Sequence, residues 1–186
     1  MANRANHYEA AFEAYVRSIR VPCVAVDEAK RAIFGDEGVK NPDFLLYPQW
    51  SPNLVVEVKG KRGKDARGRR PWENWVKTDD LDGLARWQET FGPGFRAILS
   101  FVYAEPVQPF PLPRENGAFE FRGLEYRFWA VGLDDYIQHL RSRGPAWKAV
   151  AMARRAFRRR VRPLREWLPM THESCRRPRP VKERER

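Results

Sequence analysis

The sequence has few cysteines and no long apolar run, and each of these absences excludes a class of protein. Its 186 residues include only two cysteines, Cys23 and Cys175, which are far apart and belong to no metal-binding motif. This argues against a disulfide framework or a zinc site and fits a reducing cytosol. No window approaches the roughly 20 apolar residues of a membrane span. The first residues, MANRANHYEAAFEAYVRS, also lack the basic start and apolar run of a signal peptide. We therefore expect a cytoplasmic protein without a membrane partner.

Positive charge is abundant, but it is unevenly distributed. The net charge is +11 and the pI is near 10.1. From Arg154 to Arg186 there are thirteen Lys and Arg against four Asp and Glu. This stretch therefore holds most of the excess, and its arginine density favours contact with nucleic acid. The pI is thus weak evidence that the preceding, nearly neutral part of the chain binds DNA.

The order of the expected elements indicates an α/β protein. Apolar residues at helical spacing predict helices at 8–19 and 78–91, and apolar runs predict strands at 21–26, 44–47, 54–59 and 97–104. This order, αβββαβ, is typical of a mixed central sheet flanked by helices. A hairpin at 118–131 and a helix at 134–141 would complete a domain of residues 1–144. Residues 145–186 are expected to form a C-terminal basic helical extension, with a helix to about Leu168 and a disordered tail.

Three charged residues stand on two apolar segments that are predicted to be buried strands. Pro42-Asp43 precedes FLLY, and Glu57-Val58-Lys59 ends LVVEVK, with thirteen residues between Asp43 and Glu57. Buried charges are costly unless they are paired or hold a metal. Alternation along a strand puts Glu57 and Lys59 on one face, and a tight hairpin would bring Asp43 near Glu57. Two carboxylates suit Mg²⁺ or Mn²⁺, a metal-bound water is a nucleophile, and Lys59 would orient that water or stabilise negative charge.

The first predicted helix offers a further acid. Glu9 falls on the border of the apolar stripe, beside Val16, whereas Glu13 lies further toward solvent and can pair with Arg17. Glu9 is therefore the better candidate to reach inward, to a metal-bound water.

These motifs resemble those of the PD-(D/E)XK nuclease superfamily, and within it those of archaeal-type Holliday junction resolvases and related small endonucleases. The resemblance runs from about Tyr8 to Ala104. It includes the helical Glu of EAAFEAYVRS, Pro42-Asp43, the run Glu57-Val58-Lys59-Gly60, and the later passages DLDGLARWQETFG and AILSF. The chain departs from the family where Arg20-Val-Pro replaces a glycine turn and where the C-terminal half extends past the usual core.

The resemblance implies a restriction endonuclease-like core and a Mg²⁺-dependent endonuclease acting on DNA, including branched or repair intermediates. Its metal acids would be Asp43 and Glu57, its catalytic lysine Lys59 and its helical acid Glu9. The backbone carbonyl of Val58 would be a further metal ligand. If the likeness extends to assembly, the protein would be a homodimer.

Other residues are candidates for contacts with the substrate or the site. The segment 59–70 carries seven basic residues against one acid, and it would clamp phosphates without regard to sequence or else be a solvated loop. Its candidates are Lys61, Arg62, Arg69 and Arg70. Gln88 falls on the buried face of its helix, where it would orient a catalytic group or be a hydrogen-bonded core amide.

Three other interpretations remain open. The same fold could be a catalytically inactive nucleic-acid-binding module. The chain could instead be a basic scaffold that binds RNA. The charged motif itself could be a salt bridge between Lys59 and a carboxylate at a sheet edge.

Overall fold

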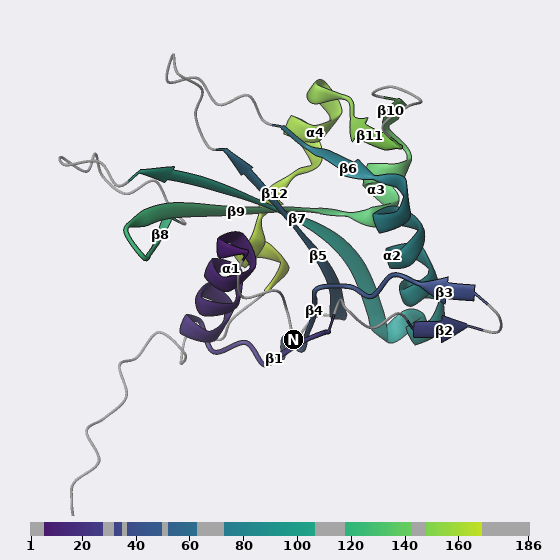
Figure 1. Ribbon diagram of the computed structural model, residues 1–186, viewed down its shortest axis with the longest axis horizontal. Helices are drawn as coiled ribbons and strands as arrows, with labels where there is room; N and C mark the ends of the chain where they lie inside the picture. The colour runs from purple at the N-terminus through teal and green to yellow at the C-terminus, as the bar shows by residue number, and fades with distance from the viewer. Residues whose placement is uncertain are drawn as a thin grey trace, which may run out of the picture.

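A mixed β-sheet forms the centre of the computed structural model, which describes residues 6–27, 32–34, 37–49, 52–62, 73–106, 118–142 and 148–168. The strand order is β1-β4-β5-β7-β9-β12, and β8 pairs with β9 at the side (Figure 1). These strands are β1 (Cys23–Ala25), β4 (Phe44–Leu46), β5 (Asn53–Arg62), β7 (Phe95–Pro106), β8 (Ala118–Phe121), β9 (Leu124–Gly132) and β12 (Arg162–Pro163). β5 and β7 are parallel, and the other pairings of this sheet are antiparallel.

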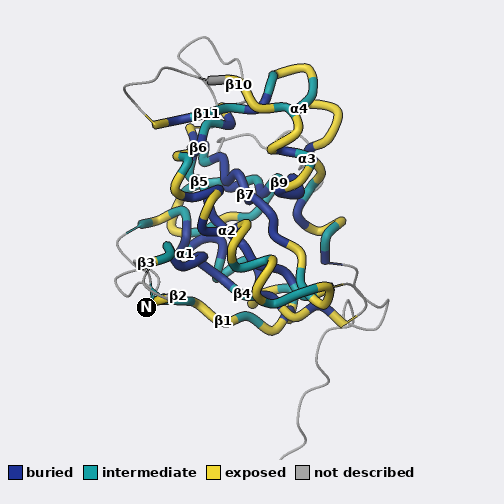
Figure 2. The backbone as a smooth tube through the Cα atoms, turned by 90° about the vertical axis from the view of Figure 1, so that its right-hand side faces the viewer, coloured by how far each residue is buried: buried dark blue, intermediate teal, exposed yellow. Residues whose placement is uncertain are grey.

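Helices cover both faces of the sheet and give it two hydrophobic cores. α1 (His7–Ser18) packs on one face, and α2 (Thr78–Phe91) and α3 (Leu133–Ile137) pack on the other (Figure 1). Alternation along β5 divides its side chains between the two cores, because Leu54 and Val56 join Phe12 of α1 while Val55 joins Leu84 of α2. Figure 2 shows the buried stretches concentrated in β5, β7 and β9. Glu57, which is on the same face of β5 as Val55, is therefore enclosed between the sheet and α2.

Smaller elements surround the sheet. A second sheet has the order β10-β11-β6, and β2 pairs with β3 in a separate hairpin. Arg122 and Gly123, with φ of 49° and 77°, form the turn between β8 and β9, as a two-residue type I′ hairpin requires. None of the helices in the described ranges has the length and apolar character needed to cross a bilayer. The remaining bounds are β2 (Ala32–Phe34), β3 (Glu37–Val39), β6 (Trp75–Lys77), η1 (Gly92–Gly94), β10 (Leu140–Ser142), β11 (Ala149–Met152), α4 (Arg154–Arg160) and η3 (Leu164–Trp167).

The predicted elements have counterparts in the structure up to β9, but the order αβββαβ omits β2, β3 and β6, and the prediction fails beyond β9. The two long helices, the strands of the main sheet and the hairpin lie within a few residues of their predicted bounds. The helix expected at 134–141 ends at Ile137, and Leu140 begins a strand. The single basic helix expected from 145 to 168 is wrong, since within the described residues 148–168 the α-helix is confined to 154–160, strands lie on either side of it, and 164–167 is a separate 3-10 helix.

The physical reason is that this segment supplies core residues. Phe157 and Val161 are buried in the core on the α2 face, and Leu164 and Leu168 are buried in the core on the α1 face. The folded unit therefore extends at least to Leu168, past the boundary expected at residue 144. The tail after residue 168 lies outside the described residues.

Candidate functional site

Asp43 and Glu57 lie next to each other where β4 meets β5. Phe44 pairs with Val56 in the antiparallel register, so Asp43 stands opposite Glu57 at the next position. The backbone N–H of Asp43 donates to the carbonyl of Val56 at 3.0 Å, and its carboxylate accepts a hydrogen bond from the backbone N–H of Val58 at 2.5 Å. Both acids are only 2% exposed. Strand pairing thus puts two buried acidic residues at opposing positions of adjacent strands.

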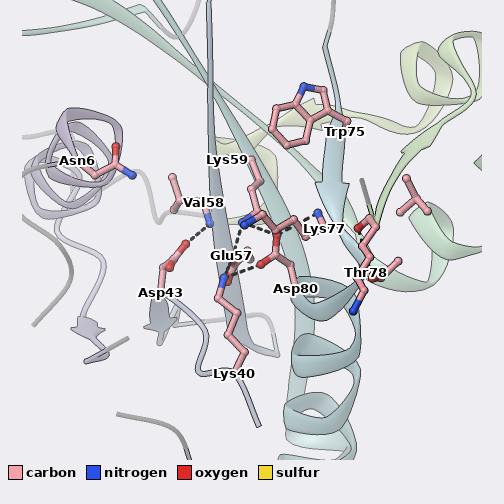
Figure 3. A network of polar contacts seen from close by, with 12 residues as sticks. Asn6, Lys40, Asp43, Glu57, Val58, Lys59, Trp75, Lys77, Thr78 and Asp80 are labelled. Atoms are coloured by element: carbon pink, nitrogen blue, oxygen red, sulfur yellow. Dashed lines mark hydrogen bonds and ion pairs between the residues drawn. The ribbon is translucent and has the colours of Figure 1, made fainter. Parts of the chain in front are cut away.

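Glu57 also belongs to a closed ring of two carboxylates and two ammonium groups (Figure 3). Lys59 Nζ lies 2.6 Å from Glu57 Oε1 and 2.7 Å from Asp80 Oδ2. Lys40 Nζ lies 2.5 Å from the same Glu57 Oε1 and 2.6 Å from Asp80 Oδ1. The ring pairs Lys59 with a carboxylate, as the salt-bridge interpretation foresees. It does so on a central strand, however, and not at a sheet edge.

The ring shifts the pKa values of its two carboxyls in opposite directions. Burial raises the pKa of Glu57 above its ordinary value, against the charges of Lys59 and Lys40. Burial also acts to raise the pKa of Asp80, but the charges and hydrogen bonds of the two lysines outweigh it and lower this pKa. Burial lowers the pKa of each lysine, but the two carboxylates more than offset it, so both lysine pKa values are raised. The ring therefore keeps both lysines charged at neutral pH.

Close packing between α2 and the segment before β4 fixes the position of Lys40. Its carbonyl oxygen accepts a hydrogen bond from Trp87 Nε1 at 3.1 Å. A Cβ at Gly83 would come within 2.8 Å of the same oxygen. Glycine costs about 1 kcal/mol relative to alanine inside a helix, and this close approach explains its presence. Asp80, three residues earlier on α2, also accepts a hydrogen bond from the backbone N–H of Lys77 at 3.2 Å, which fixes the other side of the ring.

The donor atoms present suit a hard divalent cation. Both lysines contact Oε1 of Glu57, and among the described residues Oε2 has no hydrogen bond or ion pair. Asp80, by contrast, has an ammonium group on each oxygen. Mg²⁺ is commonly held by one or two carboxylates and keeps several waters. Asp43, Glu57 and the carbonyl of Val58 are oxygen donors of this type at the pairing of β4 and β5, and their binding of a metal stays a prediction. Within the described ranges, no three His, Cys, Asp or Glu side chains are grouped so that they could hold a metal.

Glu9 is turned inward, as its position on the helical stripe predicts. It is buried on α1, and its Oε1 accepts a hydrogen bond from Nδ2 of Asn6, the N-cap residue of the helix. Glu13 lies on the outer side and pairs with Arg17 at 3.3 Å. The ion-pair ring, however, faces α2, so Glu9 approaches the site from the opposite face of the sheet. Its contact with a metal-bound water stays a prediction.

Of the four basic candidates for phosphate contact, the structure describes Lys61 and Arg62. Lys61 is buried, and its Nζ donates to the carbonyl of Trp75 at 3.0 Å and lies 3.4 Å from the centroid of that ring. This burial contradicts the prediction for Lys61, and strand alternation explains it, because Lys61 shares the face of β5 that β6 covers. Arg62 points the other way and is exposed. Arg69 and Arg70 lie outside the described residues.

Gln88 does not orient a catalytic group. Its Oε1 accepts a hydrogen bond from the backbone N–H of Ala97 at 2.6 Å, and its Nε2 lies 3.4 Å from Asp134 Oδ1. It stands eight residues after Asp80, about 12 Å along the helix at 1.5 Å per residue. The side chain is therefore a hydrogen-bonded amide, as one interpretation has it, but it is half-buried and lies outside the core.

Sequence patterns did not reveal two members of the ring, Lys40 and Asp80. An acidic residue such as Asp80 is common near the start of a helix, because its negative charge interacts favourably with the helix dipole. Nothing in the local pattern indicates that it is buried. Lys40 precedes the Pro-Asp motif in a polar stretch. The one available signal is Gly83, since a glycine inside a helix suggests close approach by another segment.

Comparison with known proteins supports the fold. No family model matches the sequence, and no curated protein matches it. Among solved structures, the chain is similar to Archaeoglobus fulgidus Hjc, a Holliday junction resolvase from an archaeal hyperthermophile, with a TM-score of 0.50 and 15% identity. The match covers 88% of this chain and 98% of that one. At this identity the likeness concerns the fold alone, and the chain therefore shares with that resolvase a central mixed sheet flanked by helices.

Proposed function

We propose that this chain is a divalent-metal-dependent endonuclease that hydrolyses phosphodiester bonds in DNA, built on a restriction endonuclease-like core. The observation that carries the proposal is the side-by-side placement of Asp43 and Glu57, with the Lys59 ammonium on Glu57. Two acids can hold a divalent metal, and a charged lysine beside them can stabilise negative charge on a phosphate. Metal-dependent phosphodiester hydrolysis needs both functions. The similarity of fold to a Holliday junction resolvase supports the same activity.

The residues have distinct roles in this proposal. Asp43, Glu57 and the carbonyl of Val58 would hold Mg²⁺ or Mn²⁺, which supplies charge neutralisation and an acidified water when bound. Lys59, kept charged by its two carboxylate partners, would stabilise the negative charge that develops on the phosphate. Glu9 would hold a metal-bound water from the α1 side.

The finer parts of the proposal concern substrate and assembly. Arg62, exposed at the end of β5, would contact a phosphate of the DNA backbone without reading its sequence. The likeness to a junction resolvase favours branched DNA and repair intermediates as substrates. It also favours a homodimer that presents two sites to such a substrate, acting in the cytoplasm.

A cleavage assay tests the proposal directly. The protein would be incubated with labelled duplex, four-way junction, flap and single-stranded DNA in Mg²⁺, in Mn²⁺ and in chelator. We expect cleavage only with metal, and a loss of about 100-fold or more in Asp43→Asn and Lys59→Met. The matched controls are Asp79→Asn and Lys77→Met, which remove the same charges from exposed positions at the start of α2. Cleavage that persists in chelator or in Asp43→Asn would refute the assignment.

A catalytically inactive nucleic-acid-binding module is the competing proposal. The ion-pair ring favours it, because Lys40 and Lys59 already neutralise Glu57 without a metal. It predicts DNA binding that is the same with and without Mg²⁺, and no cleavage of any substrate. Gel-shift titrations beside the cleavage panel separate the two proposals.

A further inference from the structure

Lys40 has no part in the proposed reaction, yet its ammonium group lies on the carboxylate that would hold the metal. It contacts Glu57 Oε1 at 2.5 Å, and it contacts Asp80 Oδ1 at 2.6 Å. Lys59 already bridges the same two acids. Two charges of each sign therefore balance, and a dication added to this arrangement would meet two ammonium groups at close range.

We propose that Lys40 is an internal cation that neutralises Glu57 in the metal-free protein and competes with a divalent cation for that carboxylate. Asp80 retains the Lys40 ammonium when Glu57 is released. This inference rests on the proposed metal site at Asp43 and Glu57, and it adds a residue that sets the affinity of that site.

The geometry identifies Lys40, and not Lys59, as the side chain that moves. Lys59 is on a central strand and is 19% exposed, whereas Lys40 lies between strands β3 and β4 and is 29% exposed. The backbone of Lys40 is fixed by Trp87 and by its contact with Gly83, so only the side chain is free to turn.

Space for that movement is present on the outer side of the ring. Lys40 lines an open cavity of about 510 Å³ between β3 and α2. Asp79 and Asp82 line the same cavity, and both are exposed. Arg86 also lines this cavity, so the two carboxylates there exceed its positive charge by one. An ammonium group that leaves Glu57 thus keeps Asp80 and enters a net acidic surrounding, which lowers the cost of its displacement.

The test measures metal affinity without DNA. Chelator-treated full-length protein would be titrated with Mn²⁺ by isothermal calorimetry, for the wild type and for variants at two positions of the ring. Lys40→Met and Lys40→Gln should bind Mn²⁺ about tenfold more tightly or better, because a positive charge beside the site is gone. Lys40→Arg keeps the charge and should bind like the wild type. Asp80→Asn should bind more weakly, because Lys40 then has Glu57 as its remaining ring partner.

The control variant, and the opposite changes in Mn²⁺ affinity expected at Lys40 and Asp80, exclude a general effect on folding. Lys77→Met removes an exposed charge near Asp80 and should change the affinity less than twofold. Loss of structure would weaken Mn²⁺ binding in every ring variant, whereas the inference requires tighter binding on removing Lys40 and weaker binding on removing Asp80. Thermal unfolding of each metal-free variant shows which of them are folded. If Lys40→Met is unfolded, Lys40→Gln replaces it in the titration.

The result also separates this inference from the proposed function. If Asp43→Asn abolishes Mn²⁺ binding while both neutral Lys40 variants bind like the wild type, the metal site stands and the role of Lys40 is refuted. If Asp43→Asn binds Mn²⁺ as the wild type does, the proposed metal site itself is wrong, and the inference fails with it. Tight binding by Lys40→Arg would also overturn the inference, because the charge would then not be the cause.

Discussion

Replacing Asp80 with asparagine should destabilise the protein far more than the same change at Asp79. Asp80 is 5% exposed and receives two ammonium groups at 2.6 and 2.7 Å. Removing one partner of a buried ion pair costs about 3–5 kcal/mol. Because the two lysines are partly exposed and can regain contact with water, we expect a loss of about 2–3 kcal/mol here. Asp79 is exposed in the same first turn of α2, so its loss should cost only the helix-dipole contribution, about 0.5 kcal/mol.

The effect of Asp80→Asn should depend on pH with a definite sign. Burial acts to raise the pKa of Asp80, but the two lysines lower it below its ordinary value of 3.8. A carboxyl whose pKa is lower in the folded state contributes stability that is present above its unfolded pKa and is lost as the pH falls through its folded pKa. The gap between wild type and variant should therefore be full at neutral pH and should narrow below 3.8.

Urea denaturation followed by tryptophan fluorescence measures both effects. The free energy of unfolding would be determined for the wild type, Asp80→Asn and Asp79→Asn at neutral pH and at several acidic values, wherever the wild type unfolds in two states. Equal stability of the two variants at neutral pH would refute the claim that the ring stabilises the fold. A gap that stays constant on acidification would refute the lowered pKa of Asp80.

Three further predictions concern the framework of the site. Gly83→Ala should destabilise the protein by about 1–2 kcal/mol although alanine favours helices, because the new Cβ meets a backbone carbonyl. Gly94→Ala, with no atom within 4 Å of the new Cβ, is its neutral control in thermal melts. A chain ending at Gly144 should show no cooperative thermal unfolding, since it lacks β11, β12 and their buried neighbours, whereas a chain ending at Leu168 should melt like the full chain. Gln88→Ala should cost about 1–2 kcal/mol in urea denaturation by leaving a strand N–H without its acceptor, yet it should not change Mn²⁺ affinity in calorimetry.

Most of the main sheet could be predicted because its signals are local. The run 54–59 is apolar enough to be a buried strand, and alternation assigns Glu57 and Lys59 to one face whatever packs there. The helix at 78–91 has both an apolar stripe and acidic residues in its first turn, and the structure confirms it within a residue.

The C-terminal segment could not be predicted in the same way. Its composition from 154 to 160 is that of a solvated basic helix, and about two turns of such a helix are present. The apolar residues Phe157, Val161 and Leu164 follow the spacing of one helical face, which favours a continuous helix and not the strand at 162–163. They are buried because the sheet and its helices leave core space for them, which is a property of the assembled fold.

The same division holds within the site. The sequence alone predicted that Asp43 and Glu57 stand at neighbouring positions of paired strands, because two strands close together in the chain can pair in few registers and the apolar pattern favours one. Only the tertiary structure decided which charges complete the site. Lys40 joins Glu57 across 17 residues and Asp80 across 40, through the packing of α2 against the segment before β4. No local pattern encodes that contact, because it depends on where a helix docks on a sheet.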